Sequence, residues 1–196
     1  FPGCGCTTPR VAALAIMLTD AGLGDYWEDV DRYVRNHMLE GQLLNADLLR
    51  ELSLKAPKHE VKSPQETSDR VIERSLGAFA LYGVDPTITL EDIHCGGCCI
   101  ANNTQGIYYI WEAIVRYNNG VAKVNLLLNR ASPWLDLDSY LPYEGKVVLK
   151  NKTAKKIFVR VPNWVDKRDV SSSINEKKAS PYWFGNYLMF ENLEGK

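Results

Sequence analysis

Cysteine is the residue type best able to do chemistry in this 196-residue sequence, and its five copies fall into two groups. Cys4 and Cys6 form a C-x-C pair near the beginning, and Cys95, Cys98 and Cys99 form a C-x-x-C-C group much later. Both groups lie in glycine-containing segments beside predicted helix starts, whereas cysteines used only in packing would be spread along apolar stripes. The grouping therefore indicates one shared site.

Three kinds of site are compatible with these two groups. A soft tetrahedral metal ion, most simply zinc, prefers thiolate ligands of this kind. Redox-active thiols and cysteines with no link to one another are the alternatives. A framework of disulfide bonds is disfavoured by the odd cysteine count and by the adjacency of Cys98 and Cys99. His94, just before the second group, is a further candidate ligand.

The overall composition excludes several classes of protein. Hydrophobic residues make up 45% of the chain and charged residues 24%, which are ordinary values for a globular protein. The net charge of -1 argues against a nucleic-acid partner. A membrane partner is not expected either, because no apolar run approaches the ~20 residues of a membrane span. We interpret the locally basic segment 146–168 as the solvated face of a sheet.

The first half of the sequence has the periodicity of helices. Thr8 and Pro9 suit a helix start, and Gly22 suits the end of that helix. Ser63 and Glu66 form a capping-box pattern that predicts another start. Helices are expected over residues 8–22, 25–41, 45–54, 63–80 and 103–117, with an irregular segment over 82–101.

The second half has the alternation of strands. β-branched and aromatic residues predict strands over residues 122–128, 146–149, 156–161 and 187–190. Short strands at this spacing are typical of a β-sandwich. The fold class is therefore α followed by β, with a helical domain over residues 1–118 and a β-sandwich domain over residues 119–196.

The second cysteine group carries a resemblance to a known family. Cys98-Cys99-Ile100-Ala101-Asn102 resembles the C-C-x-x-N motif of the β-L-arabinofuranosidases, glycoside hydrolase family 127 and its relatives. Further segments along nearly the whole chain are similar to that family: Cys4 to Thr8, Gly24 to Trp27, Asp31 to Asn36, Asp69 to Val71, Gly77 to Ala80, Tyr108 to Glu112, Val124 to Asn129 and Val159 to Trp164.

The resemblance implies a fold and a place in it. The family folds as an (α/α)6 barrel followed by β-sandwich domains. Residues 1–118 would be the C-terminal part of the barrel and would carry the cysteine cluster. Residues 119–196 would be an incomplete β-sandwich, and we expect the chain to be part of a longer protein.

The resemblance also implies a chemistry. The family hydrolyses glycosides with retention, through a zinc-bound cysteine nucleophile. Cys98 matches that nucleophile, and Cys6 and Cys99 match the other cysteine ligands of the metal. Cys4 stands where the family has a metal-binding glutamate, so we expect zinc on Cys4, Cys6, Cys98 and Cys99, with Cys95 as a spare thiol. The partner would be a carbohydrate: a β-L-arabinofuranoside or a related plant-glycan sugar.

Departures from the family keep other functions open. Four thiolates are typical of a closed structural zinc site, and Gln105 replaces an arginine that follows the family's motif. The family's general-acid glutamate lies upstream of Phe1, so the isolated chain is expected to be inactive. A non-catalytic homologue with structural zinc is the alternative, as a carbohydrate-binding or structural protein, and a thiol redox protein is the third.

The helices should also leave an apolar surface open. Part of a barrel exposes faces that its absent helices would cover, which predicts a homo-oligomer or association with the rest of the chain. The candidate residues are Val11, Leu14, Leu18, Ile107 and Ile114. The sequence leaves the compartment open, although thiol clusters favour the cytoplasm.

Overall fold

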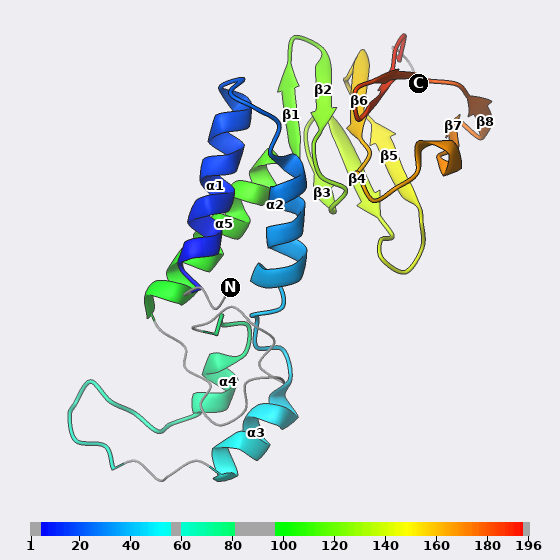
Figure 1. The fold of residues 1–196 in the computed structure, drawn as a ribbon. Helices are drawn as coiled ribbons and strands as arrows, with labels where there is room; N and C mark the ends of the chain where they lie inside the picture. The colour runs from blue at the N-terminus through cyan, green and yellow to red at the C-terminus, as the bar shows by residue number, and fades with distance from the viewer. Residues whose placement is uncertain (1–4, 56–59, 81–96, 194–196) are drawn as a thin grey trace. The chain divides into compact units, whose positions relative to one another are not determined.

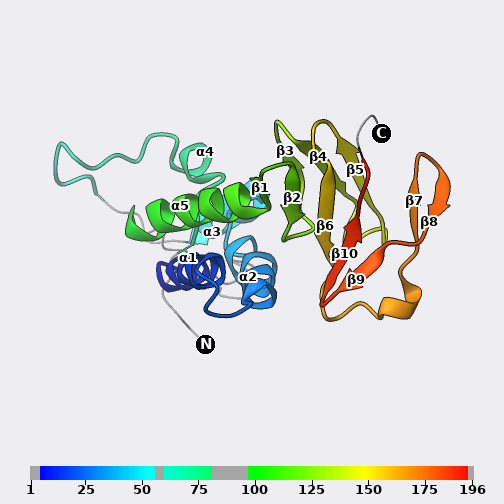
Figure 2. The same ribbon diagram turned by 90° about the horizontal axis from the view of Figure 1, so that it is seen from above.

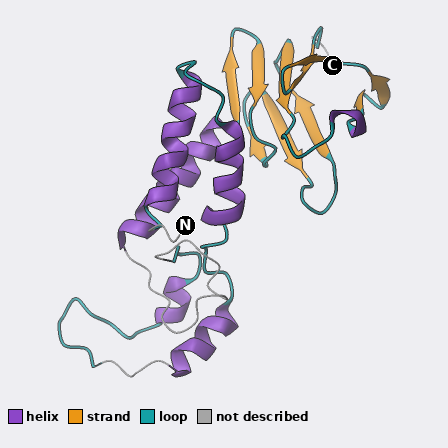
Figure 3. Ribbon diagram, viewed as in Figure 1, coloured by secondary structure: helices purple, strands orange, loops and turns teal. Residues whose placement is uncertain are grey.

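The computed structural model describes residues 5–55, 60–80 and 97–193. All the α-helices of the described residues precede the strands along the chain, so the predicted α-then-β order is confirmed. Figure 3 colours the helices and strands, including the short 3-10 helix Lys167–Asp169 that follows β6. The chain divides into two compact units, Phe1–Tyr109 and Ile110–Lys196. The assignment of residues 1–118 and 119–196 to a barrel and a sandwich stays a prediction.

Three helices of the first unit form its packed part. Helix α1 spans Thr7–Asp20, and α2 spans Trp27–Tyr33 and continues as a π-helix over Val34–Met38. Helix α5 spans Gly97–Ala113 and lies beside both (Figures 1 and 2). The buried residues of these helices include Ala12, Ala15, Ile16, Trp27, Val30, Val34, Met38 and Asn103. No helix in the described ranges is long and apolar enough to cross a membrane.

The end of α1 follows the sequence prediction. Gly22 has a φ of 74°, a left-handed conformation that glycine adopts easily. Its amide donates to the Thr19 carbonyl at 3.0 Å, and the Leu23 amide donates to the Leu18 carbonyl at 2.9 Å. This pair of bonds is the Schellman motif, which stops a helix at such a residue.

The segment after α2 contains shorter helices, α3 over Ala46–Lys55 and α4 over Val71–Ser75. The predicted helix over 63–80 is therefore wrong except for α4. Ser63 and Glu66 form a turn instead, in which the Glu66 carboxylate accepts from the Lys62 amide at 2.9 Å. Arg70 precedes α4 with a φ of 48°, which an α-helix cannot contain.

Helix α5 also differs from its prediction at both ends. It begins at Gly97 instead of Asn103, and residues Val115–Asn118 form strand β1 instead of a last helical turn. Two bonds from Asn125 explain the end of the helix. Its side-chain amide donates to the Ala113 carbonyl at 3.0 Å, and its backbone amide donates to the Ile114 carbonyl at 2.8 Å.

The second unit contains a five-stranded sheet in the order β1-β2-β6-β10-β9. Strands β2 and β6 are parallel, and the other pairs are antiparallel. Asn119 and Gly120 join β1 to β2 with positive φ at both positions, as a tight hairpin requires. Besides β1, the strands are β2 (Val121–Val124), β6 (Lys156–Arg160), β9 (Tyr182–Phe184) and β10 (Tyr187–Phe190).

Two smaller sheets complete the described part of this unit. Their strands are β3 (Arg130–Ala131), β4 (Leu135–Ser139), β5 (Val147–Asn151), β7 (Ser172–Ile174) and β8 (Lys177–Ala179). Alternating residues fill the core: Ala122, Val124, Leu135, Leu137, Ile157, Val159 and Leu188. Each predicted strand overlaps an observed one, while β1, β3, β4, β7, β8 and β9 were not predicted.

The expected apolar surface is present in part. Val11 and Leu14 on α1 are 39% and 53% exposed, whereas Ile114 is only 1% exposed, so its predicted exposure is wrong. Ile114 is buried because its carbonyl accepts the Asn125 amide and the chain turns into β1 there. Leu18 and Ile107 are half-buried.

A glycine sets how closely α1 approaches α5. A Cβ atom on Gly106 would lie 2.3 Å from the Pro9 Cβ, 3.0 Å from the Pro9 Cα and 3.1 Å from the Met38 Cε. The proline atoms belong to a rigid ring and backbone, so they cannot move aside without moving α1. Gly106 is therefore the position where the two helices touch through their backbones.

Replacing Gly106 with alanine should push α1 away from α5. Overpacking of this kind costs about 1–3 kcal/mol of the free energy of unfolding, which outweighs the gain in helix propensity. Gly97→Ala in the same helix is the matched control, because nothing lies within 4 Å of a Cβ there. Urea unfolding followed by circular dichroism measures both variants. Equal stability of the two would show that the helices are not in close contact at Gly106.

Candidate metal centre

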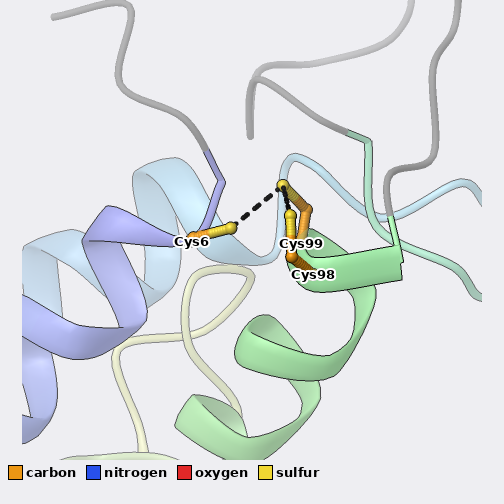
Figure 4. Close-up of side chains that lie close together, drawn as sticks. All are labelled: Cys6, Cys98 and Cys99. Carbon is orange, nitrogen blue, oxygen red and sulfur yellow. Dashed lines mark hydrogen bonds between the residues drawn. The ribbon is translucent and has the colours of Figure 1, made fainter.

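Three cysteine side chains meet at the beginning of α1 and α5 (Figure 4). Cys6 is the residue just before α1, and Cys98 and Cys99 lie in the first turn of α5. The Cys6 and Cys99 sulfurs are 3.2 Å apart, and those of Cys98 and Cys99 are 3.7 Å apart. All three sulfurs lie within 4.8 Å of one another, so they form a group that could hold a metal ion.

The three thiols differ in their access to solvent. Cys99 is fully buried, Cys6 is half-buried and Cys98 is exposed. The group therefore has one closed side and one open side, and Cys98 lies on the open side.

The sulfur distances fit a metal better than covalent bonds between the cysteines. A disulfide bond is ~2.05 Å long, so the three sulfurs are not bonded to one another. Zinc–thiolate bonds of ~2.3 Å in a tetrahedron place neighbouring sulfurs about 3.8 Å apart. The observed separations of 3.2 and 3.7 Å are close to that value, so the donor set fits a thiolate-binding ion such as zinc.

The helix ends provide favourable electrostatics for thiolates. The N-terminus of a helix carries partial positive charge on its unpaired amide groups. The N-termini of α1 and α5 lie together at the cysteines (Figures 1 and 4), and neither first turn contains an acidic residue. The cysteines therefore lie where the partial positive charges of two helix ends meet.

Two asparagines connect this site to its surroundings. The Asn102 side chain donates to the Cys98 carbonyl at 2.7 Å and accepts from the Arg10 Nε at 3.1 Å. The Asn103 side chain donates to the carbonyls of Gly5 at 2.8 Å and Cys99 at 2.9 Å. Sequence analysis named Asn102 through the family motif but missed Asn103.

A signal for Asn103 was present in the sequence. Cys99, Asn103, Gly106 and Ile110 recur at helical spacing, and all four are buried. A polar residue inside an apolar helical stripe needs hydrogen-bond partners. That pattern would have indicated a buried polar contact next to the cysteines.

Other residues singled out in the sequence are not at this site or are not described. Cys4, His94 and Cys95 lie outside the described residues. Glu112, in a segment similar to the family, pairs with Arg116 at 2.6 Å on the surface. Gln105, at the family's arginine position, donates to the Tyr109 hydroxyl at 2.7 Å.

Comparison with known proteins adds no relative. No protein-family profile matches the sequence, and no curated protein is significantly similar to it. The functional argument therefore depends on the geometry of the cysteines and on the motif around Cys98.

The reduced chain should bind one zinc or cobalt(II) ion through this group. Cys6→Ser and Cys99→Ser should each weaken the affinity at least about tenfold, since even outer-shell contacts contribute that much. Cys95→Ser is the control and should leave metal content unchanged. Competition titration with a chromophoric chelator measures the metal affinity of the wild type and of the three variants. A loss of metal affinity in Cys95→Ser as large as that in Cys6→Ser would contradict the assignment of Cys6, Cys98 and Cys99 as the ligands.

Proposed function

We propose that this chain is part of a retaining glycoside hydrolase related to the β-L-arabinofuranosidases, with Cys98 as the nucleophile. The observation that carries the proposal is that Cys6 lies next to Cys98 and Cys99 in the structure. Cys6 and Cys99 are 93 residues apart in the sequence. The family resemblance requires this meeting, and packing alone gives no reason for three thiols to gather at two helix starts.

Zinc is the proposed ion, held by Cys6, Cys98 and Cys99, with Cys4 as the fourth ligand by its place in the C-x-C pair. When bound, zinc stabilises the thiolate form of its cysteine ligands at neutral pH. Cys99 and Cys6, which are buried and half-buried, suit the role of permanent ligands. Cys98 suits a second role because its sulfur is the exposed one.

Cys98 would act in two steps. Its thiolate attacks the anomeric carbon of the sugar, a carbon–sulfur bond forms, and the bond to the leaving oxygen breaks. A general acid protonates that oxygen. Water then attacks the same carbon and gives its proton to the deprotonated general acid, the carbon–sulfur bond breaks, and the sugar leaves Cys98 as a thiolate. The resemblance implies that the general acid is a glutamate outside this chain.

The fold provides further support for the (α/α)6 barrel and β-sandwich of the resemblance. Helices α1 and α5 lie side by side with their N-termini at the same end, and α2 runs back in the opposite direction (Figures 1 and 2). This up-and-down arrangement is what neighbouring layers of a helical barrel require. The exposed Val11 and Leu14 suit coverage by further helices or by a second copy of the chain.

The proposed partner is a carbohydrate, with no role for nucleic acid or membrane. The basic segment offers little free positive charge, because several of its lysines pair with carboxylates. Lys150 contacts Asp138 at 2.9 Å, and Lys152 contacts Asp136 at 2.6 Å. Reduced thiols at the site suit the cytoplasm.

A structural zinc site is the second candidate function. The observation that favours it is the C-x-C pair, which offers a fourth thiolate from Cys4 and so a closed site. In such a protein the zinc would only stabilise the helices, and the protein would be a carbohydrate-binding or structural protein. A thiol redox protein is the third candidate, and the free thiols of Cys6, Cys98 and Cys99 are also what its reduced form would contain.

The full-length protein should hydrolyse an aryl β-L-arabinofuranoside, and Cys98→Ser should abolish that turnover, because serine oxygen is a poor nucleophile without its own base. Cys95→Ser is the matched control. The isolated chain should be inactive on natural oligosaccharides, since general acid catalysis contributes ~10²–10⁴-fold. Release of the aryl group and of arabinose measures both activities. Wild-type turnover in Cys98→Ser would favour structural zinc instead.

A further inference from the structure

We propose that Asn103 is a positioning residue that holds the Cys6 segment against Cys99, so that the thiols of the two groups lie within reach of one metal ion. The proposal rests on the metal site of the proposed function. Asn103 contacts no sulfur; it acts through the backbone on either side of the cluster.

The evidence is a pair of hydrogen bonds from one side-chain amide. The Asn103 Nδ2 donates to the carbonyl of Gly5 at 2.8 Å, and Gly5 is the residue before Cys6. The same nitrogen donates to the carbonyl of Cys99 at 2.9 Å. An amide nitrogen has two hydrogens to donate, and both are used here. One rigid planar group therefore connects the two segments that supply the ligands.

Burial gives this connection its strength. Asn103 is only 1% exposed, so water cannot replace either bond. A buried carbonyl that loses its donor remains unsatisfied, which is more costly than losing an exposed bond. The Gly5 carbonyl lies outside helix α1, and Pro9, four residues further on, has no amide hydrogen to donate to it. Asn103 thus determines the direction of the backbone just before Cys6.

A second hydrogen bond between α1 and α5 at this end is of a different kind. The Asn102 side chain accepts from the exposed Arg10 side chain, which is flexible and does not fix the backbone before Cys6. The contact of Gly106 with Pro9 lies further along both helices. Asn103 therefore bonds directly to both ligand-bearing backbones.

The variant Asn103→Ser removes the hydrogen bond to Gly5 and keeps one to Cys99. A serine within a helix can bond the carbonyl four residues back, which here is that of Cys99, but it is too short to reach Gly5. Asn103→Asp is the second variant, since a carboxylate has the same shape and cannot donate to either carbonyl. Asn125→Ser is the matched control. Asn125 is also 1% exposed, donates to the Ala113 carbonyl and accepts from the Tyr187 hydroxyl, in the other unit.

The first measurement is cobalt(II) titration, read from the thiolate-to-cobalt absorption. We expect Asn103→Ser and Asn103→Asp to bind cobalt about 10–100-fold more weakly than wild type. The absorption per bound ion should also fall, because fewer thiolates coordinate. Asn125→Ser should lower only the thermal stability and keep the wild-type affinity. A merely structural role for Asn103 would lower stability without changing the spectrum.

The second measurement needs no metal. In a protein with Cys4, Cys95 and Cys98 replaced by serine, an azo oxidant such as diamide takes two electrons and two protons from Cys6 and Cys99. The oxidant becomes the hydrazine, and the two cysteines form a disulfide. Peptide mass spectrometry after metal removal gives the rate. Adding Asn103→Ser should slow this reaction severalfold, and adding Asn125→Ser should not.

The two measurements separate the two proposals. If wild type binds no cobalt, the proposed metal function fails, and the disulfide rate still decides the role of Asn103. If both Asn103 variants keep wild-type affinity, absorption and disulfide rate, the positioning role is wrong. Should Asn103→Asp fail to fold, Asn103→Ser alone decides, because it keeps the bond within α5.

Discussion

The contact between α1 and α5 is the constraint on which the site depends. Cys6 and Cys99 are 93 residues apart in sequence, so they meet only because the two helices begin at the same place. Gly106 permits that approach, since a Cβ there would lie 2.3 Å from the Pro9 Cβ. A packed interior cannot absorb such an overlap without displacing a helix. A backbone contact in the middle of two helices thus determines where their first residues lie.

Sulfur chemistry made the position of the site partly predictable. Thiols in two groups indicated a common site, and the structure brings Cys6, Cys98 and Cys99 together. The hydrogen bonds of Asn103 were not predictable in the same way. Their acceptors are the carbonyls of Gly5 and Cys99, and backbone carbonyls are present at every residue. Sequence reasoning identifies reactive side chains well and the backbone groups that position them poorly.

The error at the end of the predicted helix over 103–117 also arises from a contact with residues distant in sequence. Ile107, Ile110, Ile114 and Val115 follow helical spacing, yet the helix ends at Ala113 and Val115 pairs with Val124. A short apolar run fits a helix or a strand, so a partner distant in sequence decides between them. At Gly22 the prediction succeeded because the helix stop is local: it needs only a residue that tolerates positive φ.

The charge of the cluster explains why the helix ends matter. If the cysteines hold Zn²⁺ as proposed, three thiolates with the ion would carry a net charge of -1, and a fourth thiolate from Cys4 would make it -2. The first turns of α1 and α5 contain one cationic side chain, Arg10, and its Nε donates to Asn102. In such a cluster the backbone amides of the two converging helices would help to stabilise the negative charge. Such amides are fixed in direction, so their effect on a thiolate depends on where Asn103 and Gly106 hold the helices. The reactivity proposed for Cys98 thus depends on how α1 packs against α5.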